Sequence, residues 1–294
     1  MIDLKLLLVL NEGLVFGIFA LGIFLAFQWL KFPDLTPDGS FIIGPIVFVK
    51  FTMIGTPIFL SAILGVIAGF LLGALTASLN KFLKIPSIIS GLIMSTASYS
   101  IGWWILNKPN QSLEVESEFF NNSSMSLNSL YLFFLLTITV LIIIFLFQLF
   151  GKSIFGLRLR AIGENSKLSK DLLISERKYF IVGLGLANSL VALSGILFIQ
   201  RSYSVDINMG IGQTITGLIA MILGLLLSQK SRRIWLSVLL IVIGAIIHKA
   251  IILITLEIGL PAESFRLVSA ILIVVLFFLM KKIDDNFLKG LKWS

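Results

Sequence analysis

The chain alternates between long apolar runs and short polar segments along its whole length. A run of about 20 apolar residues can cross the ~30 Å hydrocarbon core of a bilayer as a helix. We therefore predict nine transmembrane spans and an all-α polytopic membrane protein. The predicted spans cover residues 6–30, 41–54, 55–79, 86–106, 129–150, 178–200, 210–227, 235–256 and 263–280.

The composition agrees with this pattern. Of the 294 residues, 57% are apolar and 13% are charged, whereas soluble domains carry about 25% charged residues. The first apolar run has no small-residue cleavage site, so we interpret it as a mature helix and not as a signal peptide. The lack of cysteine excludes disulfides and thiol catalysis. A single histidine leaves little material for a metal centre, and we expect neither a metal nor another cofactor.

The basic residues predict the orientation, because lysine and arginine concentrate in the cytoplasmic loops of membrane proteins. Segment 151–178 carries seven basic residues against three carboxylates, which places it inside. Loop 107–128 carries one lysine and three glutamates, which places it outside. Nine crossings then put the N-terminus outside and the C-terminus in the cytoplasm. The net charge of +8 reflects this topology, so nucleic acid is not an expected partner.

No separate soluble domain fits between the spans, so we expect one transmembrane domain over residues 1–294. Its predicted parts are a first half (1–150), a cytoplasmic loop (151–177), a second half (178–281) and a cytoplasmic tail (282–294). Small residues recur in the third and sixth spans and predict close helix packing there. They are Gly65, Gly69 and Gly73, and Gly183, Ala187, Ser194 and Gly195.

Two polar segments each precede a short apolar span. "KFPDLTPDGSF", Lys31 to Phe41, precedes span 41–54, whose 14 residues give ~21 Å of helix and include Gly44 and Pro45. This span crosses only as a broken helix, or with help from the polar segment. "RSYSVDINMGIG", Arg201 to Gly212, precedes the second short span in the same way. Interrupted spans in corresponding positions of two halves indicate a transport site at an inverted repeat. Coincidence is the alternative, because polar connectors containing Asp and Gly are common.

Polar side chains at membrane depth are candidates for a solute pathway or gate. The candidates are Asp34, Thr36, Asp38 and Ser40 in the first segment, Asp206 and Asn208 in the second, and Lys249 in the eighth span. A structural explanation is also open, because Asp38 or Ser40 can cap a helix that begins at Phe41, and "TPDG" is typical of a turn. We favour a mixed role, in which Thr36 and Asp38 shape the turn while the whole loop lines or gates the pathway.

Lys249 lies near the middle of its span, beside His248. We expect it to face a protein or aqueous interior and to pair with a carboxylate. Glu257, Asp38 and Asp206 are the partners considered, and the sequence does not choose between them.

The basic loop contains a second candidate region. Asn165 or Ser166 can cap a short helix in which Leu168, Leu172 and Leu173 recur on one face. Such a helix can lie on anionic headgroups or merely connect two spans. It can also dock into a groove of a cytoplasmic partner.

The runs "GLRLRAIGENSKLSKDLLI", "GLGLANSLVALSGILF" and "DINMGIG" occur in this order and resemble permease subunits of bacterial ABC importers, in the branched-chain amino-acid and ribose permease superfamily. "FPDLTPDGSF" and "IPSIISGLIMSTASYSI" are similar to the first half of a subgroup associated with tryptophan and tyrosine. The resemblance covers nearly the whole chain. No G-x-x-x-x-G-K-[ST] motif occurs, so any ATPase is a separate chain.

The resemblance implies a homodimeric, non-catalytic permease of the bacterial inner membrane that works by alternating access. It also implies cytoplasmic ABC ATPase subunits and an extracytoplasmic substrate-binding protein as partners. The ATPase-docking residues by this match are Arg160, Gly163, Glu164, Asn165, Leu168, Leu172 and Leu173. The leucines and lysines of "KLSKDLLIS" depart from the small residues and glycine that are usual near the end of this helix.

Two alternatives to an amino-acid importer stay open from the sequence. One is a proton-coupled secondary transporter that uses Asp206, His248 or Lys249. The other is an ABC permease for sugars or nucleosides.

Overall fold

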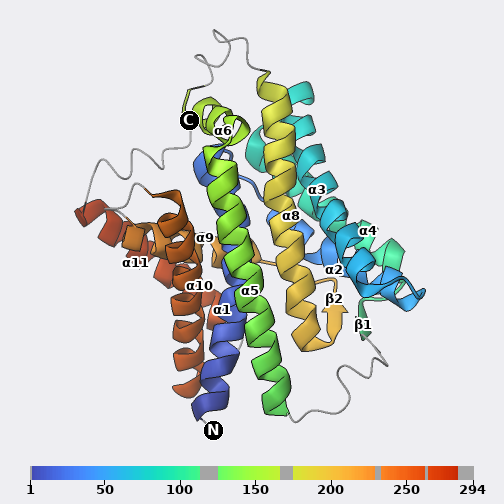
Figure 1. The fold of residues 1–294 in the computed structure, drawn as a ribbon, viewed down its shortest axis with the longest axis vertical. Helices are drawn as coiled ribbons and strands as arrows, with labels where there is room; N and C mark the ends of the chain where they lie inside the picture. Colours follow the sequence, from blue (N-terminus) through green and yellow to red (C-terminus); the bar gives the residue numbers. More distant parts are fainter. Residues whose placement is uncertain (1, 113–124, 166–174, 229–232, 262–263, 284–294) are drawn as a thin grey trace. The chain divides into compact units, whose positions relative to one another are not determined.

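The computed structural model describes residues 2–112, 125–165, 175–228, 233–261 and 264–283. Helices dominate these residues, with one short two-stranded ribbon (Figure 1). The elements are α1 (Ile2–Phe24), the π-helical turn η1 (Leu25–Trp29), α2 (Pro37–Met53), α3 (Ile58–Leu83), α4 (Ser87–Leu106), β1 (Asn110–Ser112), α5 (Met125–Lys152), α6 (Ile154–Glu164), α8 (Glu176–Ser202), β2 (Ser204–Asp206), α9 (Gln213–Ser228), α10 (Ile234–Glu257) and α11 (Phe265–Ile283). The prediction of an all-α polytopic membrane fold is confirmed.

Six of the described helices are long and apolar enough to cross a membrane. They are Lys5–Trp29, Ile58–Leu83, Ser87–Leu106, Leu130–Lys152, Glu176–Ser202 and Ile234–Glu257. Each of the six coincides with a predicted span. At the seventh and ninth predicted spans the structure has shorter apolar helices, Gln213–Ser228 and Phe265–Phe278. The second predicted span corresponds to α2, which has 17 residues.

The start of α2 differs from the sequence prediction. The helix begins at Pro37, with Thr36 at the N-cap position and no capping hydrogen bond from a side chain. Neither Asp38 nor Ser40 is therefore the cap. Proline suits the first helical turn, because its fixed φ is helical and the N–H that it lacks would have no partner there.

The predicted break near Gly44 is also absent, because α2 continues through Pro45 to Met53. Proline inside a helix cannot donate to the carbonyl four residues earlier, which here is that of Phe41. Gly195 of α8 packs on this place, and a Cβ added to it would lie 2.5 Å from the Phe41 carbonyl oxygen. α2 thus continues beyond Pro45, and α8 packs on the turn in which the backbone hydrogen bond is missing.

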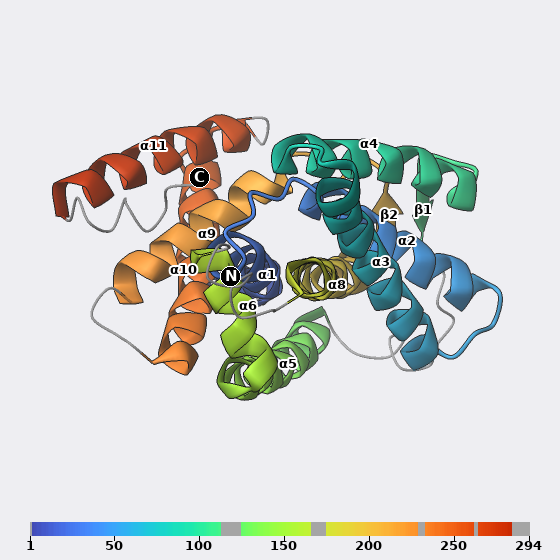
Figure 2. The same ribbon diagram turned by 90° about the horizontal axis from the view of Figure 1, so that it is seen from above.

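The chain divides into two compact units. The first contains Met1–Ala20, Val115–Gln148 and Ile215–Ser294, and the second contains Leu21–Glu114 and Leu149–Thr214. The boundaries pass through α1, α5 and α9, so each unit combines segments from the two halves of the sequence. Within the second unit, α3 packs along α8, and α2 contacts α3, α4 and α8 (Figure 2).

Loops that the charge pattern places on one side of the membrane lie at one end of the second unit. Loop 107–128 and the second polar segment meet where β1 pairs antiparallel with β2, with Asn110 opposite Asp206. At the opposite end of α8, an ion pair of 2.7 Å between Lys81 Nζ and Glu176 Oε1 joins α3 to α8. Figure 1 shows the ribbon and α6 at opposite ends of α8.

The small residues of α3 and α8 let the two helices approach closely, as predicted. A Cβ added at Gly73 would lie 2.2 Å from the Leu184 carbonyl oxygen, and one added at Gly69 would lie 2.4 Å from the Ala192 Cβ. In lipid, association of helices relies on such packing because apolar burial alone gives no preference for protein over acyl chains. Close backbone approach is therefore a main source of stability in this unit.

We expect the Gly73→Ala variant to unfold at a clearly lower temperature than the wild type in detergent. The new methyl group meets a backbone oxygen, which cannot rotate away, and overpacking of this kind costs about 1–3 kcal/mol. Gly102→Ala is the matched control in α4, because its new Cβ would meet only the flexible Ile46 Cδ1 at 2.7 Å. Intrinsic fluorescence during heating measures both variants. Equal shifts in the two variants would contradict the packing argument.

Candidate functional site

The first polar segment joins η1 to α2 inside the second unit. Lys31 adopts a φ of 52°, which turns the chain after η1. Asp34, Thr36 and Ser40 are then completely buried. Buried polar groups need hydrogen-bond partners, because leaving one unpaired costs about 1–3 kcal/mol. The partners of these side chains therefore show how the segment is held.

Asp34 is the centre of a hydrogen-bonded cluster. One of its oxygens accepts from the Thr36 backbone N–H at 2.8 Å and from the Thr36 hydroxyl. Its other oxygen accepts from Asn188 Nδ2 at 2.8 Å. The Ser40 hydroxyl donates to Asn188 Oδ1 at 2.7 Å, and the Thr36 and Thr76 hydroxyls lie 2.7 Å apart. The cluster fixes the polar segment to α3 and α8.

Asn188 and Thr76 were not among the residues predicted from the sequence. Asn188 lies in a run of small and apolar residues that indicates helix packing, and Thr76 follows the glycines of α3. A polar residue in an apolar span is a signal for a buried contact, but only the tertiary packing of α3 against α8 shows that both meet Asp34.

Asp38 joins the two polar segments. Its Oδ1 accepts from the Thr214 backbone N–H at 2.7 Å and from the Thr214 hydroxyl at 2.6 Å. Its Oδ2 accepts from the Gly212 N–H at 3.0 Å. Gly212 directly precedes α9 and Thr214 lies in its first turn, where N–H groups have no partner within the helix and favour a negative charge. Asp38 therefore caps the start of α9 from a distant part of the chain.

Asp206 and Asn208, the other two candidates from the second polar segment, do not take part in the contact with Asp38. Asp206 stands in β2, and within the described part of the chain its carboxylate accepts one local bond, from the Asn208 N–H at 2.6 Å in an exposed turn. The second polar segment meets the first through Gly212, its last residue, and Thr214 of α9 makes the remaining bonds. The Asp and Gly residues shared by the two polar segments pointed to the second segment. They did not show which residues contact Asp38.

Lys249 belongs to the first unit, where α1 and α10 pack together. Its Nζ lies 3.4 Å from Glu12 Oε2 and 3.5 Å from the centroid of the Phe16 ring. Glu12 was not among the partners considered from the sequence. Glu257, which was, pairs instead with Lys5 at 2.9 Å. The two ion pairs thus join α1 to α10 at successive levels.

His248 is also buried in the first unit, with 1% of its surface exposed. Its Nε2 lies 3.4 Å from the Ser269 hydroxyl oxygen of α11. Within the described ranges, Nδ1 has no hydrogen-bond partner. The histidine and Lys249 therefore have different partners, Ser269 and Glu12, among the described residues.

Four of the predicted docking residues lie in or directly after α6. The Arg160 side chain donates to the Gly151 carbonyl at 2.6 Å and lies 5.1 Å from the Trp29 ring centroid. A Cβ added at Gly163 would lie 2.0 Å from the Trp29 carbonyl oxygen. Asn165, which the sequence suggests as the cap of a following helix, is the residue that ends α6.

Electrostatics also connects α6 to the first polar segment. Partial burial lowers the pKa of the Lys31 ammonium group, and the nearby Glu164 carboxylate opposes this shift. The end of α6 therefore packs at Gly163 on Trp29 and Leu30, directly before the segment, and the charge of Glu164 acts on Lys31 at its start. Leu168, Leu172 and Leu173, with the rest of segment 166–174, lie outside the described residues.

Comparison with known proteins gives a family and two relatives. The sequence profile of the family described as "Branched-chain amino acid transport system / permease component" matches residues 5–277. A tyrosine transport system permease protein of Clostridioides difficile (strain R20291) is 30% identical over 266 residues, covering 90% of this chain and 88% of the relative. An uncharacterized protein of Rickettsia prowazekii (strain Madrid E) is 32% identical over 219 residues, covering 74% and 76%.

A solved structure has a similar fold. The complex described as PsaBC from Streptococcus pneumoniae in complex with Fab contains a chain with a TM-score of 0.51 and 17% identity, covering 92% of this chain and 89% of that one. The sequence match extends from α1 into α11 and includes both polar segments. This chain therefore belongs to the family of branched-chain amino acid transport system permease components.

Proposed function

We propose that the protein forms the membrane pathway of an ATP-binding cassette importer for an amino acid or a similar small polar solute. The family match over residues 5–277 carries this proposal. The relative named for tyrosine transport, which aligns with 90% of the chain, favours an aromatic amino acid. Separate ATPase subunits drive the transport, and an extracytoplasmic binding protein delivers the solute.

The proposed assembly contains two copies of the permease in the bacterial inner membrane. The basic loops define the cytoplasmic side, with the N-terminus outside and the C-terminus inside. The shorter helices α2, α9 and α11 complete nine crossings with the six long ones. The meeting of the two polar segments at Asp38 supports an inverted repeat, in which corresponding short spans of the two halves converge.

The contact between α6 and the first polar segment supports a route for coupling. ATP binding closes the ATPase subunits and moves the docking segment, which comprises α6 and residues 166–174. Because Gly163 packs directly on the Trp29 carbonyl, movement of α6 displaces the start of the polar segment. The displacement then reaches Asp38, nine residues beyond Trp29.

Asp34 and Asp38 have different parts in this mechanism. The Asp34 cluster holds the segment to α3 and α8 through several buried side chains, so the segment moves together with these two helices. Asp38 makes its hydrogen bonds to the start of α9 alone, so they break together when α9 and the segment separate. We infer that this contact is the gate between the two polar segments.

Reconstitution tests the proposed function directly. In proteoliposomes containing the permease, its co-purified ATPase and its binding protein, we expect uptake of radiolabelled tyrosine to require ATP on the ATPase side. A protonophore should leave the uptake unchanged. Uptake that persists without the ATPase and collapses with the proton gradient would instead establish the secondary transporter. Competition by unlabelled amino acids, sugars and nucleosides then identifies the class of solute.

A further inference from the structure

A cavity of about 730 Å³ opens in the second unit, where α3 ends and where α4 and α8 begin. The proposed orientation places it at the cytoplasmic boundary of the membrane. Polar and charged residues dominate its lining, which includes Asn80, Lys81, Lys84, Glu176 and Arg177. None of these residues takes part in the Asp34 cluster or in the Asp38 contact.

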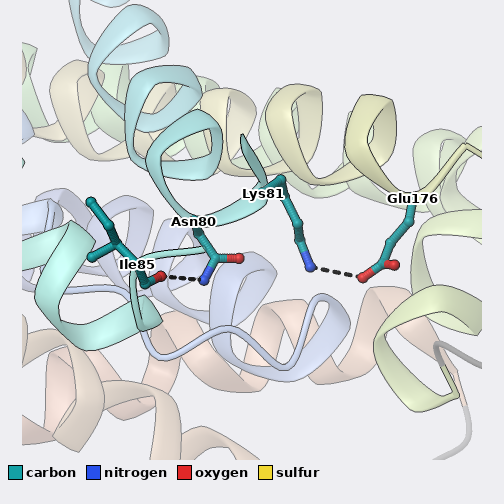
Figure 3. A network of polar contacts seen from close by, with 4 residues as sticks. All are labelled: Asn80, Lys81, Ile85 and Glu176. Carbon is teal, nitrogen blue, oxygen red and sulfur yellow. Dashed lines mark hydrogen bonds and ion pairs between the residues drawn. The ribbon is translucent and has the colours of Figure 1, made fainter. Parts of the chain in front are cut away.

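Hydrogen bonds and an ion pair hold two walls of the cavity in place (Figure 3). Asn80 Nδ2 donates to the Ile85 carbonyl oxygen at 2.8 Å, which fixes the turn between α3 and α4. Lys81 reaches from α3 toward Glu176 of α8 and pairs with it at 2.7 Å. Its ammonium nitrogen also lies 3.5 Å from the centroid of the Phe180 ring. These contacts therefore fix the positions of the residues on two sides of the cavity.

The lining carries an excess of positive charge. Three of its side chains are cationic, Lys81, Lys84 and Arg177, and one is a carboxylate, Glu176. The carboxylate is bound to Lys81, so Lys84 and Arg177 provide the surplus. Both are exposed and line the same cavity: Lys84 directly follows α3, and Arg177 belongs to α8, where its guanidinium carbon lies 5.2 Å from the Phe82 ring centroid. A phosphate group has the charge and the several acceptor oxygens that such a site requires.

Exposed apolar side chains lie next to the charged lining. Phe82 is 57% exposed, Leu83 is 66% exposed and Ile88 is 54% exposed. At the ends of membrane helices, such side chains face lipid acyl chains. The cavity and its surroundings therefore match an amphiphile, with an anionic head between the basic residues and apolar chains beside α3 and α4.

We propose that this cavity binds the phosphate headgroup of an anionic phospholipid from the cytoplasmic leaflet. Lys84 and Arg177 contact the phosphate oxygens, and the acyl chains lie along Phe82, Leu83 and Ile88. Basic pockets between helices on this side of a membrane attract anionic lipids because the leaflet itself carries negative charge. The site would join three helices of the second unit through a lipid, apart from the solute pathway.

Native mass spectrometry of the full chain tests the proposal. Delipidated protein in detergent is titrated with phosphatidylglycerol or phosphatidylcholine, and the bound fraction is counted. We expect a selective phosphatidylglycerol adduct. In the double variant K84Q/R177Q, its affinity should fall about 25-fold, because each cation near an anionic headgroup contributes roughly fivefold.

A matched control distinguishes a site from general electrostatic attraction. The double variant K178Q/K152Q removes the same charge from two exposed residues of the cytoplasmic face that do not line the cavity. It should keep wild-type affinity. Equal losses in the two double variants, or equal binding of the two lipids, would overturn the proposal. The thermal unfolding temperature of each variant confirms that it is folded.

Two further measurements distinguish a bound lipid from other ligands of the cavity. Millimolar inorganic phosphate should not displace the bound lipid, and displacement would assign the cavity to a soluble anion. The K84Q/R177Q variant should still co-purify with the ATPase. Loss of the ATPase together with unchanged lipid binding would make the cavity a docking surface for that partner. Displacement by phosphate, or loss of the ATPase with unchanged lipid binding, would overturn the lipid site. Neither result would contradict the proposed transport function.

Discussion

The Asp38→Asn variant is expected to assemble with its partners but to lose most solute-stimulated ATP hydrolysis and uptake. Asparagine keeps the size of the side chain and one acceptor oxygen, which can still face Thr214. Its amide nitrogen would face the Gly212 N–H, so two donors would meet where the carboxylate accepts a bond at 3.0 Å. The change also removes the negative charge from the start of α9.

The free energy of the hydrogen bonds lost in Asp38→Asn is large enough to change the transport cycle. Hydrogen bonds to a charged group contribute about 1.5–3 kcal/mol each, and a loss of about 1.4 kcal/mol alters an equilibrium tenfold. We therefore expect at least a tenfold decrease in stimulated hydrolysis and uptake, since the closed gate becomes a minor state. Basal hydrolysis by the ATPase subunits should remain, because they do not contact Asp38.

Asp206→Asn is the matched control for this prediction. The same change of an aspartate in the second polar segment affects only a local bond to the Asn208 N–H in an exposed turn. Its uptake should stay within about twofold of wild type, because exposed single bonds contribute little. If Asp206→Asn abolished uptake while Asp38→Asn did not, the assignment of the gate to Asp38 would be wrong.

Replacing Leu168 and Leu172 together with aspartate is expected to abolish co-purification of the ATPase subunits. The spacing places both leucines on one face of the predicted short helix, and a docking helix buries such a face in a groove of its partner. Two carboxylates in that groove would carry an uncompensated desolvation cost of several kcal/mol. Affinity purification of the permease, followed by quantification of the bound ATPase, measures the effect.

Lys170→Asp is the control within the same segment. It also changes the charge by two units, yet residue 170 falls on the opposite face of the predicted helix, about 200° from Leu168. We expect this variant to retain most of its ATPase. Retention of the ATPase by the double leucine variant would refute docking through these residues, and unchanged thermal unfolding would show that the permease itself is intact.

The fold was largely predictable because its main signal is apolar length. A bilayer requires uninterrupted apolar helices, so six spans were located from composition alone. The second span was predicted with the wrong start and with a break. Its proline was taken as a break, but α8 covers the turn at Pro45 with Gly195, and that compensation comes from another part of the chain.

The candidate site was predictable only in part. Asp34 and Asp38 were selected because carboxylates at membrane depth are costly and need a reason to be there. Their partners could not be selected in the same way. Asn188, Thr76 and Thr214 are common residue types, and nothing in their local sequence shows which distant carboxylate they contact.

The sequence by itself determined the membrane class of the protein, its family resemblance and the two polar segments that interrupt its apolar pattern. These properties depend on local composition and on charge counts, which tertiary contacts do not alter. Only the tertiary structure decided that Asp34 anchors to Asn188, that Asp38 caps α9 and that Lys249 pairs with Glu12. Hydrogen bonds and ion pairs form over about 3–4 Å, and only folding brings groups from distant segments within that range.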